Sequence, residues 1–197
     1  MAAPFTPEEQ QKIRQALRSA ALRHARADGM KRTTVDRLTE ETGISKGAFY
    51  HFYPAKEMLF LDMLESWYQE IARQAEALSK AHPELPPVER GMLMLRETIR
   101  CMSSASLSRF IRDDVPALLR KLPEDVLREH YTSDDEFILH LLHMADIPLK
   151  VKEDVAVAIV KLLLMSLINA GDIGPSYPEA LQALSDSACR QLIVGQE

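Results

Sequence analysis

Apolar side chains recur at intervals of three and four residues along most of the chain, which is the spacing of one face of an α-helix. The first such segment begins at Thr6-Pro7-Glu8-Glu9, which combines a helix N-cap, proline at the first helical position and glutamate at the third. It ends at Asp28-Gly29. No alternation of apolar and polar residues bounded by turns indicates a β-strand. The pattern predicts an all-α protein of about nine helices.

Prolines, glycines and capping residues divide this pattern into segments. Short helices are expected from Thr34 to Gly43 and from Ser45 to about Phe52, and a long helix is expected to start at Pro54. Three prolines within residues 82–87 make the clearest break. Further helices are expected over residues 88–102, from a capping box at 133–136 to about 146, over 153–170 and over 178–194, with short helical pieces around Pro116 and Pro123.

Charge is distributed unevenly along the 197 residues, whose net charge is −5. Residues 1–60 carry 10 Lys and Arg against 7 Asp and Glu, a net charge of +3, whereas the remainder carries 14 against 22, a net charge of −8. A basic first third beside an acidic remainder is typical of a part that binds a polyanion attached to a separate body. A solvated surface with a chance excess of three charges is the alternative.

The segment from 34 to 53 has the layout of a helix-turn-helix, whose second helix enters the major groove of DNA. Gly43 can adopt the positive φ that the tight turn requires. Gly47 and Ala48 are small where a helix must approach the groove closely, which leaves Lys46 and the residues after Phe49 to reach bases or phosphates. The alternative is an ordinary corner between two helices with an aromatic core.

Short motifs in this region occur in a fixed order without a gap: Ala20-Ala21, Gly29, Thr34-Val35, Leu38, the run from Gly43 to Tyr50, Tyr53, Lys56-Glu57 and Leu59. Residues 13 to about 60 thereby resemble the amino-terminal domain of the TetR (tetracycline repressor-like) bacterial transcriptional regulators. The resemblance implies a DNA-binding domain at 1–54, with the helix-turn-helix at about 34–53, and a helical effector-binding and dimerisation domain at 55–197. It also implies a repressor of palindromic operators.

The resemblance assigns roles to residues of this chain. It implies that Thr34, Tyr50 and Lys56 hold phosphates and that Lys46, Gly47, Ala48, His51 and Phe52 face base edges, with Ser45 as the cap of the recognition helix. This chain departs from the family with Ala25 in place of an aromatic residue, and with Thr39 and Thr42 in place of alanine. The two threonine hydroxyls can bond to carbonyls of their own helix. Asp36 lies near the expected DNA surface, where it would repel phosphates.

The stretch from Val155 to Ile168 is apolar almost all round, so both its sides must be covered. One side can face the core and the other a second copy of the chain, as in a symmetric dimer; enclosure within one protomer is the alternative. We expect the interface to contain Ile159, Leu162, Leu163, Leu181, Leu184, Ala188 and Leu192. The 16 residues from Val155 to Ala170 are too few to cross a bilayer, so no membrane partner is expected.

A pocket for a small, largely apolar effector is implied by the resemblance. Its candidate walls are Met63, Trp67, Met92, Leu95, Ile99, Met102, Leu107, Phe110, Phe137, Leu141 and Met144. Methionines suit an adaptable cavity, but the same stripes also fit a plain core. Glu136, His140 and His143 share a helix face that is more typical of a solvated surface than of a metal site, and no metal is expected.

Enzyme classes find little support. The chain has no glycine-rich phosphate loop, Gly-x-Ser-x-Gly, Cys-x-x-Cys or HExxH motif, and no cofactor is expected. Cys101 and Cys189 are expected to be reduced thiols, with a single disulfide as the alternative. No leader pattern appears, so the expected location is cytoplasmic. The sequence thus predicts an effector-released, homodimeric DNA-binding repressor; the alternatives are an effector-independent DNA-binding protein and a helical protein-interaction module.

Overall fold

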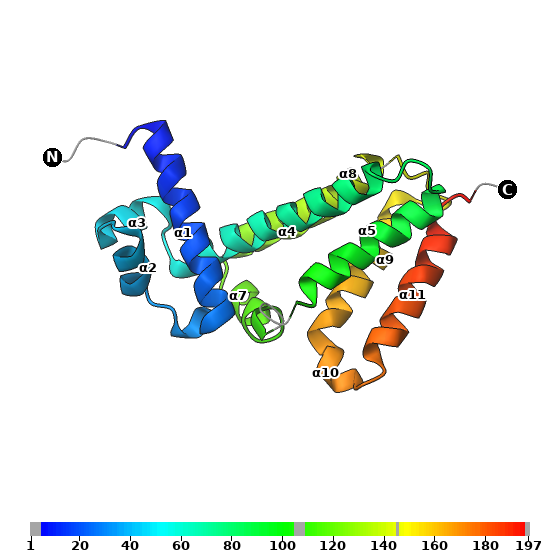
Figure 1. Ribbon diagram of the computed structural model, residues 1–197. Coiled ribbons are helices and arrows are strands. Elements are labelled where there is room, and N and C mark those ends of the chain that lie inside the picture. Colours follow the sequence, from blue (N-terminus) through cyan, green and yellow to red (C-terminus); the bar gives the residue numbers. More distant parts are fainter. Residues whose placement is uncertain (1–4, 105–108, 145, 196–197) are drawn as a thin grey trace. The chain divides into compact units, whose positions relative to one another are not determined.

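The computed structural model describes residues 5–104, 109–144 and 146–195. Within these ranges every regular element is helical, apart from one isolated antiparallel bridge between Leu149 and Ile193. The all-α prediction is therefore confirmed. The chain divides into two compact units, of which the first contains residues 1–67 and 105–122 and the second residues 68–104 and 123–197 (Figure 1). The domain boundary predicted after residue 54 lies within the first unit.

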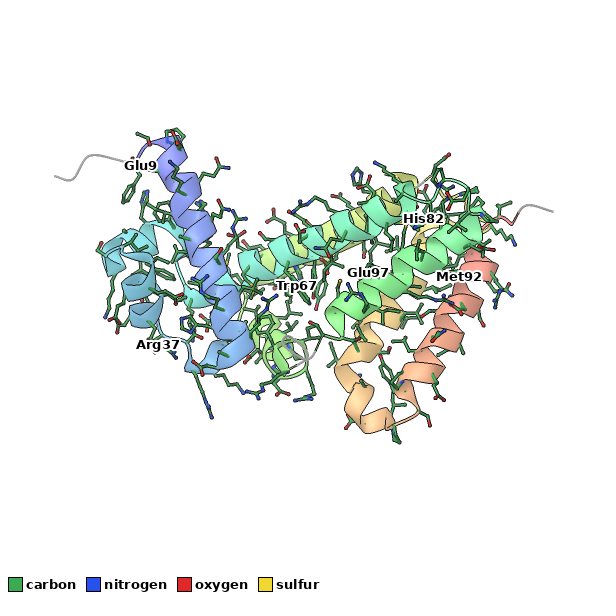
Figure 2. The ribbon with its side chains drawn as sticks, viewed as in Figure 1. Glu9, Arg37, Trp67, His82, Met92 and Glu97 are labelled. Atoms are coloured by element: carbon green, nitrogen blue, oxygen red, sulfur yellow. The ribbon has the colours of Figure 1, made fainter. Side chains whose placement is uncertain are left out.

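The first unit contains α1 (Pro7–Ala27), η1 (Met30–Arg32), α2 (Val35–Thr42), α3 (Lys46–Phe52), the first turns of α4 (Lys56–Lys80), the π-helical turn η2 (Phe110–Asp114) and α7 (Val115–Leu119). The capping box of α1 forms as predicted, because the Thr6 hydroxyl accepts from the N–H of Glu9 while the Glu9 carboxylate accepts from the N–H of Thr6. Glu9 marks this end of α1 in Figure 2. The core of the unit includes Leu17, Ala20, Ala21, Leu38, Phe49, Leu59, Phe60 and Phe110, all of which are fully buried.

A buried carboxylate joins the middle of the chain to the turn between α1 and α2. The N–H of Met30 donates to Oδ2 of Asp114 at 2.9 Å, and Asp114 is 5% exposed. Gly29 precedes this bond with φ +80°, and a Cβ there would lie 2.6 Å from the same oxygen. Only glycine therefore fits, on grounds of both backbone conformation and space.

Two further contacts attach residues 109–122 to the start of α4. The rings of Phe60 and Phe110 have centroids 6.0 Å apart, and Lys121 Nζ lies 2.9 Å from Oε1 of Glu57. This ion pair holds the pKa of Glu57 below its ordinary value, although burial opposes it. The unit that carries the helix-turn-helix is thus assembled from two separate stretches of the sequence.

The second unit contains the remainder of α4, α5 (Pro87–Met102), α8 (Glu124–Met144), α9 (Glu153–Met165), η3 (Ser166–Asn169), α10 (Ala170–Ile173) and α11 (Tyr177–Leu192). Figure 1 shows α11 packed beside α5 and α9. Their shared core is formed by Ala75, Met94, Leu95, Ile147, Ala156, Leu163, Tyr177, Leu181, Cys189, Leu192 and Ile193. At its edge, Arg96 makes a bidentate ion pair with Asp186, which joins α5 to α11.

The prediction that a helix starts at the capping box of residues 133–136 is wrong. α8 runs without a break from Glu124 to Met144, so the box lies in its interior. Asp134 Oδ2 lies 3.6 Å from Nε2 of buried His130, one turn earlier, and the Thr132 hydroxyl donates to the carbonyl of Arg128. These polar groups are therefore engaged within the helix and not at its end.

The apolar run predicted to end near Ala170 continues as helical turns to Ile173. The sequence predicts a run too short to cross a membrane, and this prediction is wrong about length. The 21 residues from Glu153 to Ile173 are long and apolar enough to cross one. One such run is weak evidence for a span, and the side of α9 that contains Ala156, Val157 and Leu163 is buried in this unit.

Cys101 and Cys189 are free thiols. Burial raises the pKa of Cys189 to about 11, and burial together with the neighbouring Glu97 raises the pKa of Cys101.

Among the residues considered for a metal site, His143 pairs with Glu153 at 2.8 Å. Within residues 5–104, 109–144 and 146–195, no cluster of three or more His, Cys, Asp or Glu could hold a metal ion.

We expect Asp114→Ala to lower the free energy of unfolding by about 1–3 kcal/mol, because it leaves the buried N–H of Met30 without an acceptor. Asp113→Ala is the matched control: Asp113 is half exposed and pairs with neighbouring Arg112, and such surface pairs contribute roughly 0–1 kcal/mol. Urea unfolding of both variants measures the difference. Equal losses would show that the bond to Met30 has no special weight.

Candidate nucleic-acid interface

The turn between α2 and α3 has the geometry that the sequence predicts. Gly43 adopts φ +69° and ψ +25°, and the N–H of Ile44 donates to the carbonyl of Thr39 at 3.1 Å. Thr34 caps α2 by accepting from the N–H of Arg37, and Ser45 caps α3 by accepting from the N–H of Ala48. Both helices therefore start and end at the predicted residues.

The aromatic side of α3 faces into the unit. Phe49 is fully buried, and Phe52 is 6% exposed beneath Phe5, with ring centroids 5.7 Å apart. The guanidinium carbon of Arg14 lies 5.4 Å from the ring centre of Phe52 and 5.3 Å from that of Tyr53. A contact between Phe52 and a base would require these neighbours to move.

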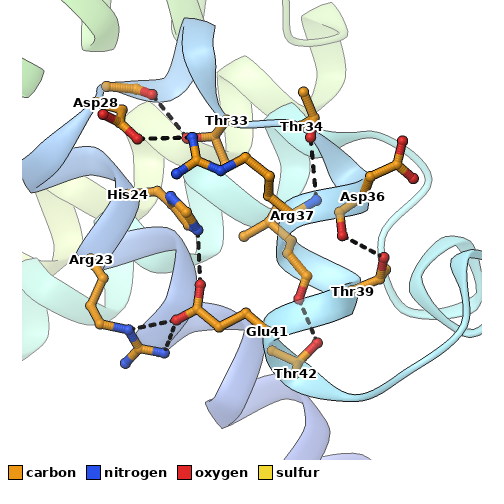
Figure 3. Close-up of polar contacts among 12 residues, drawn as sticks. Arg23, His24, Asp28, Thr33, Thr34, Asp36, Arg37, Thr39, Glu41 and Thr42 are labelled. Atoms are coloured by element: carbon orange, nitrogen blue, oxygen red, sulfur yellow. Dashed lines mark hydrogen bonds and ion pairs between the residues drawn. The ribbon is translucent and has the colours of Figure 1, made fainter.

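Glu41 ties α2 to α1 (Figure 3). Its carboxylate accepts from Nε of Arg23 at 2.7 Å and lies 2.8 Å from Nε2 of His24, a side chain that is largely buried. The bond from Arg23 is the main cause that lowers the pKa of Glu41. Arg37, which projects from α2 in Figure 2, pairs with Asp28 at 2.8 Å. These bonds fix the angle at which α2, and α3 with it, leaves α1.

The opposite side of the helix-turn-helix is exposed. Its exposed residues include Thr34, Ser45, Lys46, Gly47, Tyr50 and His51, and Ala48 is half-buried. Tyr50 is 54% exposed. A Cβ added at Gly47 would have one neighbour within 4 Å, Ser45 Oγ at 3.8 Å, so the protein leaves open the space in front of this glycine. Small residues and polar tips thus form one surface that a DNA groove can approach.

The threonines that replace the family's alanines behave as expected. The Thr42 hydroxyl donates to the carbonyl of Leu38 at 2.7 Å, and the Thr39 hydroxyl donates to the carbonyl of Asp36 at 3.0 Å. Ala25 is buried at the end of α1. Ala25 and Thr39 are buried and Thr42 is half-buried, so these departures lie mainly inside the unit.

Lys56 is half-buried and directed at the turn after α1. Its ammonium donates to the carbonyls of Met30 and Thr33 at 2.8 and 2.7 Å. Burial lowers its pKa from the ordinary value. Because an ammonium has three N–H groups, one is left for the phosphate contact that the resemblance implies. This phosphate contact stays a prediction.

Asp36 and Lys46 form an ion pair on the exposed surface, a contact that sequence reasoning missed. Lys46 Nζ lies 2.5 Å from Asp36 Oδ1. From the sequence alone, Asp36 is expected only to repel phosphates. The signal that could have revealed the pair is the presence of opposite charges in the first turns of two helices that meet at a tight turn.

The candidate effector-pocket residues are divided between the two units. Met63, Trp67 and Phe110 belong to the first, and Met92, Leu95, Ile99, Met102, Phe137, Leu141 and Met144 belong to the second. Leu107 and the side chain of Met144 lie outside the described part of the chain. Leu95 belongs to the core of the second unit, and Met92, Ile99 and Leu141 pack against it. A common pocket stays a prediction.

The candidate interface residues fall into two groups. Leu163, Leu181 and Leu192 are buried in the core of their own unit, with Ile159 and Ala188 packed against it. Leu162 and Leu184 are 68% and 61% exposed, and Met165 and Ile173 are each 57% exposed. Large apolar side chains on α9, α10 and α11 are thus exposed in the single protomer.

Residues 17–63 match the family described as bacterial regulatory proteins of the tetR family. The chain is 31% identical over 159 residues to the HTH-type transcriptional repressor AcnR of Corynebacterium efficiens, which covers 79% of this chain and 78% of the relative. It is 37% identical over 102 residues to the AcnR of Corynebacterium glutamicum, which covers 51% and 52% of the two chains.

Solved structures share the fold across nearly the whole chain. A TetR-family transcriptional regulator from Pectobacterium atrosepticum has a TM-score of 0.66 at 18% identity and covers 98% of this chain and 100% of its own. A TetR transcriptional regulator from Rhodococcus has a TM-score of 0.63 at 17% identity and covers 92% and 96%. At these identities the likeness concerns the fold.

We expect Lys56→Ala to weaken binding to all DNA sequences similarly and to reduce the slope of log affinity against log salt by about 1, because one phosphate contact is lost. It should also destabilise the protein, since the carbonyls of Met30 and Thr33 lose a charged donor. Lys80→Ala, which removes the same charge at the other end of α4, is the control. A lower stability with an unchanged salt slope would limit Lys56 to supporting the turn.

Proposed function

Because the chain belongs to the TetR family of bacterial regulatory proteins, we propose that it is a homodimeric repressor that binds a palindromic operator and is released by a small-molecule effector. The observation that carries this proposal is the exposed polar face of α3, presented by a capped helix-turn-helix whose aromatic side is buried. Such a repressor acts in the cytoplasm and catalyses no reaction.

Charge supports the binding of DNA at this end of the chain. The net charge of +3 falls on residues 1–60, which include α1, α2 and α3, while the remainder is acidic. A dimer brings two copies of residues 1–60, here called the heads, to the DNA and so doubles the positive charge near the phosphates. The acidic remainder discourages non-specific binding along DNA, which depends on the same phosphate attraction.

Dimerisation is supported by the exposed apolar side chains of the second unit. A protomer in water gains free energy by covering Leu162, Met165, Ile173 and Leu184, at about 25 cal/mol per Å² of apolar surface buried. A two-fold symmetric contact covers the same patch on both copies. It also supplies the two recognition helices that successive major grooves require, about 34–36 Å apart.

Release by an effector requires that the ligand bind the DNA-free and DNA-bound states with different affinities. We propose a small, largely apolar effector in the helical body and a shift of α4 that respaces the two heads. The apolar side chains of α5 and α8 and the family relationship support this part of the proposal. An effector-independent repressor would bind the same operator, and no ligand would displace it.

The operator is tested by footprinting the full-length protein on the promoter region beside its own gene. We expect a protected palindrome whose half-sites are about 10 base pairs apart, centre to centre, since each recognition helix enters one major groove on the same side of the duplex. DNA with one scrambled half-site is the control and should bind more weakly. The absence of a protected palindrome at low salt would contradict the proposal and favour a protein-interaction module.

The dimer is tested by replacing both Leu162 and Leu184 with glutamate. We expect light scattering to report a dimer for the wild-type protein at micromolar concentration and a monomer for the variant, because the added carboxylates cannot be buried unpaired. The affinity of the variant for the operator should fall together with its dimerisation. Gln69→Glu, which adds charge to an exposed position of α4, is the control. A wild-type monomer, or a double variant that remains dimeric, would rule out this interface.

A further inference from the structure

The Asp36–Lys46 ion pair lies where the helix-turn-helix faces outward. Asp36 is in the first turn of α2 and Lys46 is the first residue of α3, and their side chains are 64% and 61% exposed. Each side chain is therefore mostly in contact with solvent. Both are therefore available to a macromolecule that approaches α3.

The Asp36–Lys46 pair contributes little to the stability of the fold. Exposed ion pairs contribute little, because water screens the charges and two flexible side chains must be ordered. A general attraction to phosphates does not explain it either, since Asp36 cancels the charge of Lys46. A carboxylate on a DNA-binding face is useful where it meets a hydrogen-bond donor.

The major groove offers such donors on base edges. Cytosine presents its N4 amino group and guanine presents the acceptors O6 and N7, and these are the groups that carboxylates and lysines select. An ammonium only donates, and an ionised carboxylate only accepts. The Asp36–Lys46 pair thus matches the cytosine amino group and the guanine acceptors of a G·C base pair, whereas the N7 acceptor beside adenine N6 repels a carboxylate in front of an A·T pair.

We propose that Asp36 and Lys46 together read one G·C base pair in each half-site, with Asp36 accepting from cytosine N4 and Lys46 donating to guanine O6 or N7. The inference rests on the proposed binding of an operator and adds Asp36 as a residue that determines its sequence. Thymine O4 and guanine O6 in front of Asp36 are rejected, because the carboxylate has no hydrogen to donate to them.

The cation that pairs with the Asp36 carboxylate is Lys46 and not the neighbouring Arg37. Arg37, the next residue after Asp36, has its guanidinium bound to Asp28 at 2.8 Å. Asp36 therefore acts with Lys46 from the other helix. The Thr39 hydroxyl donates to the backbone carbonyl of Asp36 and leaves the Asp36 carboxylate to its exposed partner.

The test selects binding sites from random double-stranded DNA with full-length wild type, Asp36→Asn, Asp36→Ala and Glu40→Gln. Glu40→Gln is the matched control, because it removes the same charge from an exposed position of α2 one turn later. Competition binding then compares the wild-type site with variants changed at single base pairs. The salt dependence of each protein is measured on the same duplexes.

We expect the wild type to prefer cytosine at one position of each half-site by about 5- to 150-fold. Asp36→Ala should lose this preference and keep those at the other positions. Asp36→Asn should shift it towards adenine, because a carboxamide pairs with adenine N6 and N7. Glu40→Gln should leave the selected sequence unchanged.

Three outcomes overturn the inference. If both Asp36 variants bind every sequence more tightly but select the wild-type site, Asp36 acts through repulsion alone and the inference fails while operator binding stands. If the wild type enriches no sequence at all, the proposed function fails together with the inference. Equal changes of preference in the Asp36 and Glu40 variants would trace the effect to net charge.

Discussion

The turn after α1 depends on a single buried acceptor, the carboxylate of Asp114. It receives the N–H of Met30 from one side, while Lys56 holds the carbonyls of Met30 and Thr33 from another. Because η1 leads directly into α2, the position of the helix-turn-helix relative to α1 follows from these bonds. Near the other end of α2, Glu41 also fixes this position through its bonds to Arg23 and His24 of α1. The exposed face of α3 is thus positioned by a series of polar contacts, of which the bond from Met30 to Asp114 is buried.

Local patterns predicted local structure well. Thr6, Thr34 and Ser45 cap helices, and Gly43 makes the turn, because each of these roles depends on residues within four positions along the chain. The burial of Leu38 and Phe49 follows from helical spacing in the same way. For the exposed residues, spacing alone leaves open whether they form a DNA-binding surface or a solvated one, and the DNA contacts that the family resemblance implies for them stay predictions.

Contacts between distant residues could not be predicted. Asp114 and Met30 are 84 positions apart, and no local pattern distinguishes Asp114 from its neighbour Asp113, which pairs with Arg112 on the surface. The capping box at 133–136 gave a wrong helix start because its residues are polar, and polar residues also occur inside a helix when partners lie one turn away. The inward direction of Lys56 likewise depends on carbonyls brought near by the fold.

The assembly of the first unit from two stretches of sequence affects when the protein can first bind DNA during its synthesis. Residues 109–122 leave the ribosome long after α1, α2 and α3, and until they arrive the N–H of Met30 has no Asp114 to bind and Phe60 has no Phe110 to cover it. Contacts between such distant residues also form slowly. A nascent chain that stops before this stretch therefore carries every residue of the proposed DNA-binding surface on α2 and α3 and lacks Asp114 and Phe110, which support this unit.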